Sequence, residues 1–186
     1  MSPSSLIRLP FSSIHGWEDL RKNPPSFGLL LSAIVLPLSL VPPVMMYHAG
    51  TGYGDAFTVG LADREWGFIT TIFFLAELLT FAVMGWLIHQ VANTRGAAIS
   101  LHHAYLLAAI APIPLWLSAL SLFVPSLLFA TVVALLALAL SCCLVFQGLR
   151  GLCLMKEDVE AMSITYTVMA ASLMAWGLLL ALVWSF

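Results

Sequence analysis

Charged residues are scarce in this chain of 186 residues, and that scarcity excludes most classes of soluble protein. Only 9% of the residues are Asp, Glu, Lys or Arg, whereas 61% are hydrophobic, and the mean hydropathy is +1.02. Soluble domains carry about 25% charged residues, so this composition does not supply a water-facing surface. The formal net charge of −2 leaves no basic face for nucleic acid. We therefore expect a membrane protein that binds no nucleic acid.

Cysteine is also rare, and its spacing excludes the common metal-binding and disulfide patterns. The chain has Cys142, Cys143 and Cys153, an odd number without metal-type spacing. Adjacent cysteines such as Cys142 and Cys143 rarely pair with each other. We expect reduced, buried thiols and no cofactor, with a redox or lipidation role at Cys153 as the alternative.

Long apolar segments dominate the rest of the chain. A helix needs about 20 residues to cross a bilayer, and five segments satisfy this length: 27–47, 66–92, 101–124, 126–149 and 162–185. We therefore predict an all-α, polytopic membrane bundle of about five transmembrane helices over residues 27–186, without a large soluble domain. Between 47 and 66 lies the longest loop. Its glycines do not indicate nucleotide binding, because no strand precedes them.

The first 26 residues mix apolar and charged side chains, which is typical of a segment that lies in the membrane interface. We expect Trp17 at headgroup depth, with a partly disordered tail as the alternative. Arg21 and Lys22 come too late for a signal peptide.

Prolines fall inside two of the predicted spans. Pro37, Pro42 and Pro43 predict that the first span is kinked or ends early. Pro112 and Pro114 predict a bend in the third span, because proline cannot donate a backbone hydrogen bond. The small residues before this bend favour a packed central helix. The alternative is a bend that also opens a cavity or moves during function.

Lysine and arginine are distributed unevenly between the two sides of the predicted bundle. One side has only Arg64, whereas the other side has six: Arg8, Arg21, Lys22, Arg95, Arg150 and Lys156. Cytoplasmic loops carry the excess of positive residues. We therefore predict a cytoplasmic N-terminus and a C-terminus outside.

Glu77 lies near the middle of the second span, where a carboxylate costs about 2.5–3.5 kcal/mol or more. It is either a proton or ion site or a protonated acid that bonds a hydroxyl of a neighbouring helix. The candidate hydroxyls are Ser118, Ser121, Thr165, Tyr166 and Thr167.

Polar residues gather at the predicted cytoplasmic ends of the spans. His89, His102 and His103 are weak candidates for a metal site, since adjacent histidines in one helix point about 100 degrees apart. As contacts to a partner we select Arg95, His102, His103, Arg150, Lys156, Glu157 and Asp158. No histidine and carboxylate lie at the same depth in the membrane as a serine. We therefore expect no catalytic triad and no enzyme.

The third-span stretch HHAYLLAAIAPIPLWLSALSLFVP and the later segment GLRGLCLMKEDVEAMSITYTVMAASLMAW resemble the Yip family. These membrane proteins are named for their interaction with Ypt/Rab GTPases. The chain is most similar in pattern to the small bacterial branch, which is YohC-like. This resemblance implies a multi-pass protein of the bacterial inner membrane without an established reaction.

Two functions are consistent with these features. The first is a non-enzymatic membrane protein that organises membrane or partner proteins through its cytoplasmic loops. The second is a small permease or ion-coupled channel that uses Glu77 and the bend at Pro112 and that requires an oligomer. Small residues available for such an interface are Ala130, Ala134, Ala171, Ala175 and Gly177.

Overall fold

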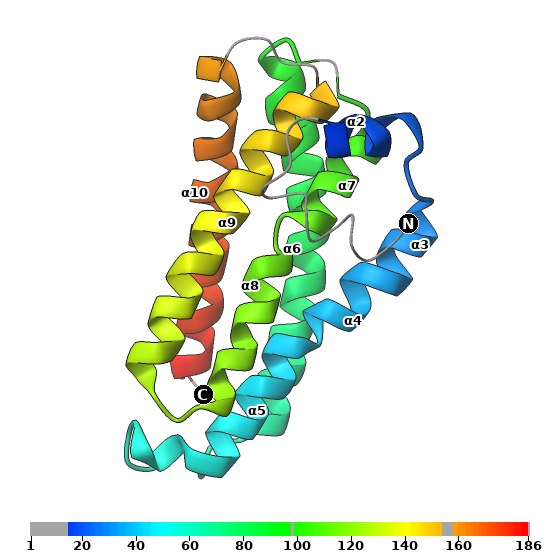
Figure 1. Cartoon of the computed structure of the whole chain (residues 1–186). Coiled ribbons are helices and arrows are strands. Elements are labelled where there is room, and N and C mark those ends of the chain that lie inside the picture. Colours follow the sequence, from blue (N-terminus) through cyan, green and yellow to red (C-terminus); the bar gives the residue numbers. More distant parts are fainter. Residues whose placement is uncertain (1–14, 98, 154–157, 186) are drawn as a thin grey trace.

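The computed structural model of this protein describes residues 15–97, 99–153 and 158–185, and they form an all-helical bundle without strands (Figure 1). Arg8, Lys156 and Glu157 lie outside these residues. Five helices are long and apolar enough to cross a membrane, as the sequence predicts. They are Phe27–Ala56, Trp66–Thr94, Leu101–Phe123, Leu127–Leu152 and Asp158–Ala181.

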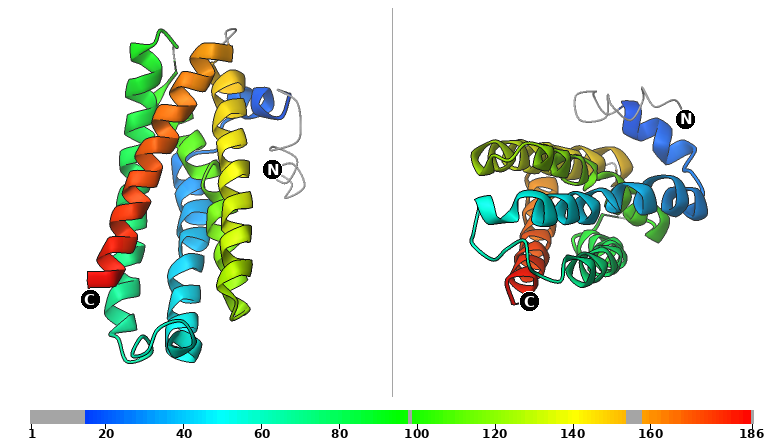
Figure 2. Two further views of the ribbon diagram at one scale, coloured as in Figure 1. Left: turned by 90° about the vertical axis from the view of Figure 1, so that its left-hand side faces the viewer. Right: turned by 90° about the horizontal axis from the view of Figure 1, so that it is seen from below.

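Helix α6 (Trp66–Thr94) and helix α9 (Leu127–Cys153) organise the packing. Helix α6 packs against the first span, the third span and α10 (Asp158–Ser185), whereas α9 packs against the third span and α10. Figure 2 shows that α10 begins beside α9 and ends beside the opposite end of α6. Because α10 is inclined in this way, it diverges from α9 along its length.

One end of the bundle collects the short helix α2 (His15–Lys22), the turn at residues 95–100 and the start of α10 (Figure 1). We call it the charged end. Helix α2 packs against α9 there. The opposite end contains the connection from η2 (Gly54–Ala56) to α6 and the turn at residues 124–126. This turn joins the third and fourth spans.

The first span contains several helical segments and is longer than the sequence indicates. A π-helical turn precedes Pro37, and the amide of Leu36 donates to the carbonyl of Leu31, five residues back. Pro42 and Pro43 do not end the span, because they occupy the first turn of α5, where a missing amide costs nothing. The expected end at residue 47 is therefore wrong. The segments are α3 (Phe27–Leu30), η1 (Leu31–Val35), α4 (Leu36–Ser39), α5 (Val41–Tyr53) and η2.

The third span is interrupted where the sequence places its bend. Helix α7 (Leu101–Ile110) ends just before Pro112, and α8 (Ile113–Ser118) continues into the 3-10 turn η3 (Ala119–Phe123). Pro114 lies in the first turn of α8. The apolar window of this span is 44% buried, the largest share of the five spans. The third span is thus the packed central helix of the bundle.

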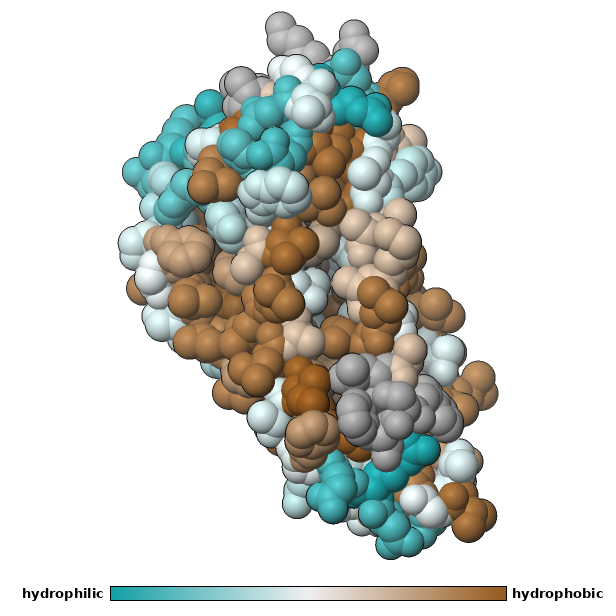
Figure 3. Space-filling view, turned by 180° about the vertical axis from the view of Figure 1, so that it is seen from behind, coloured by the Kyte–Doolittle hydropathy of each residue, from teal (hydrophilic) through white to brown (hydrophobic). Residues whose placement is uncertain are grey.

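The outer surface is that of a membrane protein. Figure 3 shows an apolar belt between two hydrophilic ends. Large apolar side chains project outward from α9 and α10, among them Leu128 and Leu178, each more than 70% exposed. Burying such side chains in lipid removes them from water at about 25 cal/mol per Å² of apolar surface. The charged end and the opposite end then lie on the two sides of the bilayer.

Candidate functional site

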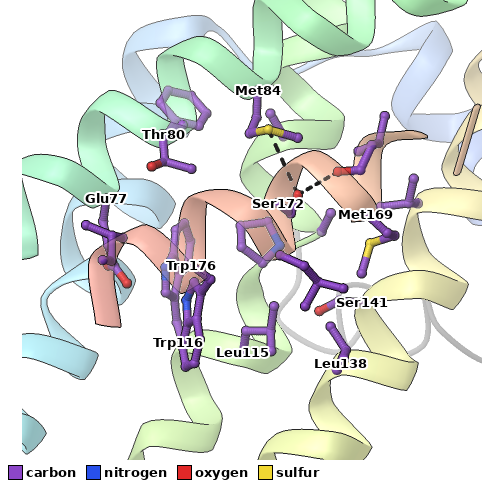
Figure 4. Close-up of a pocket in the computed structure, with 18 of the residues that line it drawn as sticks. Glu77, Thr80, Met84, Leu115, Trp116, Leu138, Ser141, Met169, Ser172 and Trp176 are labelled. Atoms are coloured by element: carbon purple, nitrogen blue, oxygen red, sulfur yellow. Dashed lines mark hydrogen bonds between the residues drawn. The ribbon is translucent and has the colours of Figure 1, made fainter. Parts of the chain in front are cut away.

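A cavity of about 340 Å³ lies in the middle of the bundle, between α6, the third span, α9 and α10. Figure 4 shows its lining side chains, which are mainly aliphatic and aromatic. The volume lies at the lower end of the range for small-molecule sites, about 300–1,000 Å³. Its four walls come from the second to the fifth spans, and Pro42 of the first span also lines it.

Glu77 of α6 lines this cavity and is 7% exposed. Its Oε2 atom is buried and has no hydrogen-bond partner among the described residues. An unpaired polar atom in an apolar environment costs about 1–3 kcal/mol by mutational measures. The unpaired carboxyl oxygen of Glu77 therefore lowers the stability of the bundle unless a ligand or another molecule pairs with it.

None of the hydroxyls that the sequence offered to Glu77 forms a hydrogen bond with it in the described structure. Ser118 Oγ donates to the Leu115 carbonyl at 2.7 Å, and Thr165 Oγ1 donates to the Ala161 carbonyl at 2.8 Å. Thr167 also bonds a carbonyl of its own helix, whereas Tyr166 is exposed. Ser121 lies in η3, and no bond from it to Glu77 is seen. Helical Ser and Thr readily make such local bonds, which leaves no hydroxyl of this set for Glu77.

Two serines that the sequence did not single out line the same cavity. Ser141 of α9 is 2% exposed, and its Oγ atom has no partner in the described structure. Ser172 of α10 donates to the Val168 carbonyl at 2.9 Å and lies 3.9 Å from Met84 Sδ. The available signal was the small-residue spacing of Ala134, Ala137 and Ser141, which also fits ordinary packing.

Pro112 and Trp116 form the wall from the third span. Helix α7 stops at Ile110 and α8 starts at Ile113, so the helix is interrupted at Pro112. Trp116 faces the cavity (Figure 4). Trp176 of α10 lines the same cavity (Figure 4). The predicted bend therefore adjoins a cavity, whereas Pro114 does not line it.

At the charged end, hydrogen bonds fix the turn between α6 and α7. Asn93 donates to the carbonyl of Ile99 at 3.2 Å and accepts from its amide at 3.1 Å. Gly96 has a φ of 82°, which L residues rarely adopt. Ser100 then caps α7 by accepting from the amide of His103 at 3.2 Å.

Two of the arginines selected as partner contacts, Arg95 and Arg150, connect elements of this chain. Arg95 Nη1 donates to Ser163 Oγ at 2.8 Å and so joins the α6–α7 turn to α10. Arg150 of α9 forms an ion pair with Asp158 of α10 at 3.2 Å. These contacts hold the start of α10 against the rest of the charged end.

The histidines do not come together as metal ligands. His102 Nε2 lies 2.9 Å from the carbonyl of Pro25, and His103 Nδ1 lies 3.0 Å from Ser100 Oγ. Within the described residues, no group of three His, Cys, Asp or Glu side chains is placed to hold a metal ion. His89 is half-buried on α6.

Helix α2 is held by Trp17, which is fully buried rather than exposed to lipid. The indole lies over Gly148 and Gly151 of α9, where a Cβ atom at Gly148 would stand 3.1 Å from the Trp17 ring. The sequence suggested the membrane interface for Trp17, and the structure shows that α9 covers it. Leu20, 2% exposed, completes the buried face of α2.

Comparison with known proteins identifies the family. A family model described as the Yip1 domain matches residues 7–184. No curated protein and no solved structure shows a significant match to the chain. The matched region includes all five spans and the bend at Pro112. This chain is therefore a multi-pass membrane protein that belongs to the Yip1 domain family.

Proposed function

We propose that this protein is a non-enzymatic, integral inner-membrane protein of the Yip type, of the bacterial branch, that organises membrane or partner proteins through its cytoplasmic loops. Residues 1–26 would form its cytoplasmic interfacial segment and residues 27–186 its membrane domain. The charged end would then face the cytoplasm, since the positive residues of the loops are concentrated there.

The observation that carries this proposal is the way separate loops are joined into one surface. Arg95 connects the α6–α7 turn to α10, Arg150 connects α9 to α10, and His102 contacts the chain at Pro25. Polar side chains remain exposed around these contacts, including Asp19, Lys22, Asp158 and Glu160. A preorganised surface binds a partner with a smaller loss of conformational entropy than mobile loops do.

The chemistry of the cavity supports a non-enzymatic role. Its described lining contains Glu77, Ser141 and Ser172, and the one possible base among them, Glu77, forms no hydrogen bond with either serine. The histidines of the third span lie at the charged end instead. Nucleophilic catalysis needs a base within hydrogen-bond reach of the nucleophile.

Site-specific photocrosslinking in intact cells tests this proposal. A photoreactive amino acid replaces Val159, which is 78% exposed at the charged end, or Val59, which is 95% exposed at the opposite end. We expect a discrete protein adduct from position 159, lost when Glu160→Lys is added, and no such adduct from position 59. An adduct of twice the chain mass would identify a second copy as the partner. Absence of any discrete adduct at position 159 would refute the proposal.

A second function, a small oligomeric permease or ion-coupled channel, is favoured by one observation. Glu77 and Pro112 line the same cavity, so a group that binds ions would stand beside the bend. Small residues on α9 and α10, such as Ala134 and Ala175, would supply the interface. Proteoliposome fluxes of protons and common cations test it. Fluxes equal to those of empty liposomes, with Glu77→Gln without effect, would eliminate this function.

A further inference from the structure

We propose that the central cavity is a lateral binding site for an uncharged, single-chain amphiphile that carries a hydroxyl group and enters from the bilayer between α9 and α10. This site is independent of the partner surface at the charged end. It is built from the four walls described above, and its opening, its unpaired polar atoms and its lack of cations limit which ligand it can hold.

The cavity opens toward lipid. Its rim includes Leu135 of α9 and Leu173 of α10, which are 60% and 51% exposed, whereas its deep wall includes Trp116, which is 6% exposed. Leu135 and Leu173 come from α9 and α10, the two helices that diverge in Figure 2. An apolar chain from the bilayer reaches such a cavity without crossing water, and the apolar walls match its surface.

The unpaired carboxyl oxygen of Glu77 determines what the ligand must carry. Glu77 Oε2 and Ser141 Oγ are both buried without a partner in the described structure, and both residues are more than nine-tenths buried. Figure 4 shows them on opposite sides of the cavity, with Trp116 and Trp176 between them. A hydrocarbon chain alone would leave both atoms unsatisfied. A hydroxyl group is both a donor and an acceptor, so it can hydrogen-bond to the Glu77 carboxyl whether or not the carboxyl is protonated. Such a bond removes the free-energy cost of leaving the carboxyl unpaired.

The charge of the lining selects against ionised headgroups. No lysine, arginine or histidine lies among the described lining residues, so nothing there pairs with a phosphate or a carboxylate. An ionised group at this depth of the membrane is expensive without a partner. A neutral alcohol avoids both difficulties. The volume of about 340 Å³ is suited to a single chain.

Photolabelling of the full-length protein in phosphatidylcholine nanodiscs tests the site. The probes are a long-chain primary alcohol and the alkane of the same length, each with a diazirine on the same carbon. We expect the alcohol to label peptides of α6, the third span, α9 and α10 about two- to tenfold more than the alkane, the range that one buried hydrogen bond supplies. Equal labelling of these peptides by the two probes would overturn the proposal.

Matched variants separate the cavity from the lipid-facing surface. Ala134 of α9 lines the cavity, whereas Ala139 of the same helix is exposed and does not. We expect Ala134→Phe to abolish the excess labelling by the alcohol and Ala139→Phe to preserve it. Unchanged labelling in Ala134→Phe would exclude binding in the cavity.

A second pair of variants tests the polar contact without filling the cavity. Glu77→Leu removes the hydrogen-bonding group, so alcohol and alkane should then label equally. Glu77→Gln retains a donor and an acceptor and should preserve the preference for the alcohol. If both variants keep the preference for the alcohol, Glu77 does not bind the hydroxyl. Crosslinking at position 159 is measured in a separate experiment. Either proposal, the amphiphile site or the partner surface, can therefore be refuted without affecting the other.

Discussion

At the scale of single residues, small side chains determine where helices approach closely. Gly85 of α6 faces the ring of Tyr105 of α7, so a Cβ atom there would overlap the ring. Tyr105 is held in place because its hydroxyl donates to the Ala82 carbonyl at 3.1 Å and its ring contacts Phe27 and Phe81. The sequence does not distinguish Gly85 from Gly67 of the same helix, since a glycine's role depends on what lies opposite it.

We expect Gly85→Ala to destabilise the bundle by about 1–3 kcal/mol, the usual range for overpacking. The new methyl group displaces Tyr105 and breaks its bond to Ala82. Unfolding in mixed micelles measures the change. Gly67→Ala is the matched control, because nothing lies within 4 Å of the added Cβ, and its stability should not fall. In the background of Tyr105→Ala, Gly85→Ala should cost much less stability, because the ring that the methyl group displaces is absent. If the destabilisations of the two single variants simply add in the double variant, displacement of Tyr105 is not the cause.

At the scale of elements, features with a local cause could be predicted from the sequence. The break in the third span was predictable because Pro112 removes a hydrogen bond from its own helix. Pro42 and Pro43 did not end the first span as expected, because proline is tolerated in the first turn of a helix and the sequence does not show where that turn starts. The cavity could not be predicted from the sequence, for a different reason. It depends on the inclination of α10 against α9, which arises from packing between distant segments.

Helix α2 provides a test at this scale, because Trp17 and Leu20 attach it to α9. We expect Trp17→Ala to release α2, since truncating a buried aromatic residue costs about 3–5 kcal/mol. Trypsin would then cleave after Arg21 and Lys22 at least about tenfold faster, because each 1.4 kcal/mol changes an equilibrium tenfold. Sequencing of the fragments measures the rate at these sites.

The control for this experiment is Asp19→Ala, which changes an exposed side chain of the same helix and should leave the cleavage rate unchanged. If Trp17→Ala is cleaved no faster than the unaltered protein, the indole does not hold α2 in place. Release of α2 would also expose Gly148 and Gly151, which lie under Trp17.

At the scale of the whole molecule, the fold places positively charged residues from separate parts of the sequence at one end of the bundle. Arg21, Lys22, Arg95 and Arg150 come from three separate segments of the sequence, and all four lie at the charged end. Arg64 lies in the connection at the opposite end. The sequence predicted this separation because alternate loops of a multi-pass protein fall on alternate sides. It did not predict that Arg95 and Arg150 bond to α10, since those contacts depend on tertiary packing.

The separation of charge predicts how the molecule sits in the membrane, with Val159 in the cytoplasm and Val59 outside. Single cysteines at these exposed positions, in a chain whose Cys142, Cys143 and Cys153 are replaced by alanine, report the orientation through a membrane-impermeant maleimide. We expect Val59→Cys to be labelled in intact spheroplasts and Val159→Cys to be labelled only after permeabilisation. Both valines are largely exposed, so burial does not account for a difference. Labelling of Val159→Cys before permeabilisation would invert the topology, and the surface joined by Arg95 and Arg150 would then have no access to cytoplasmic partners.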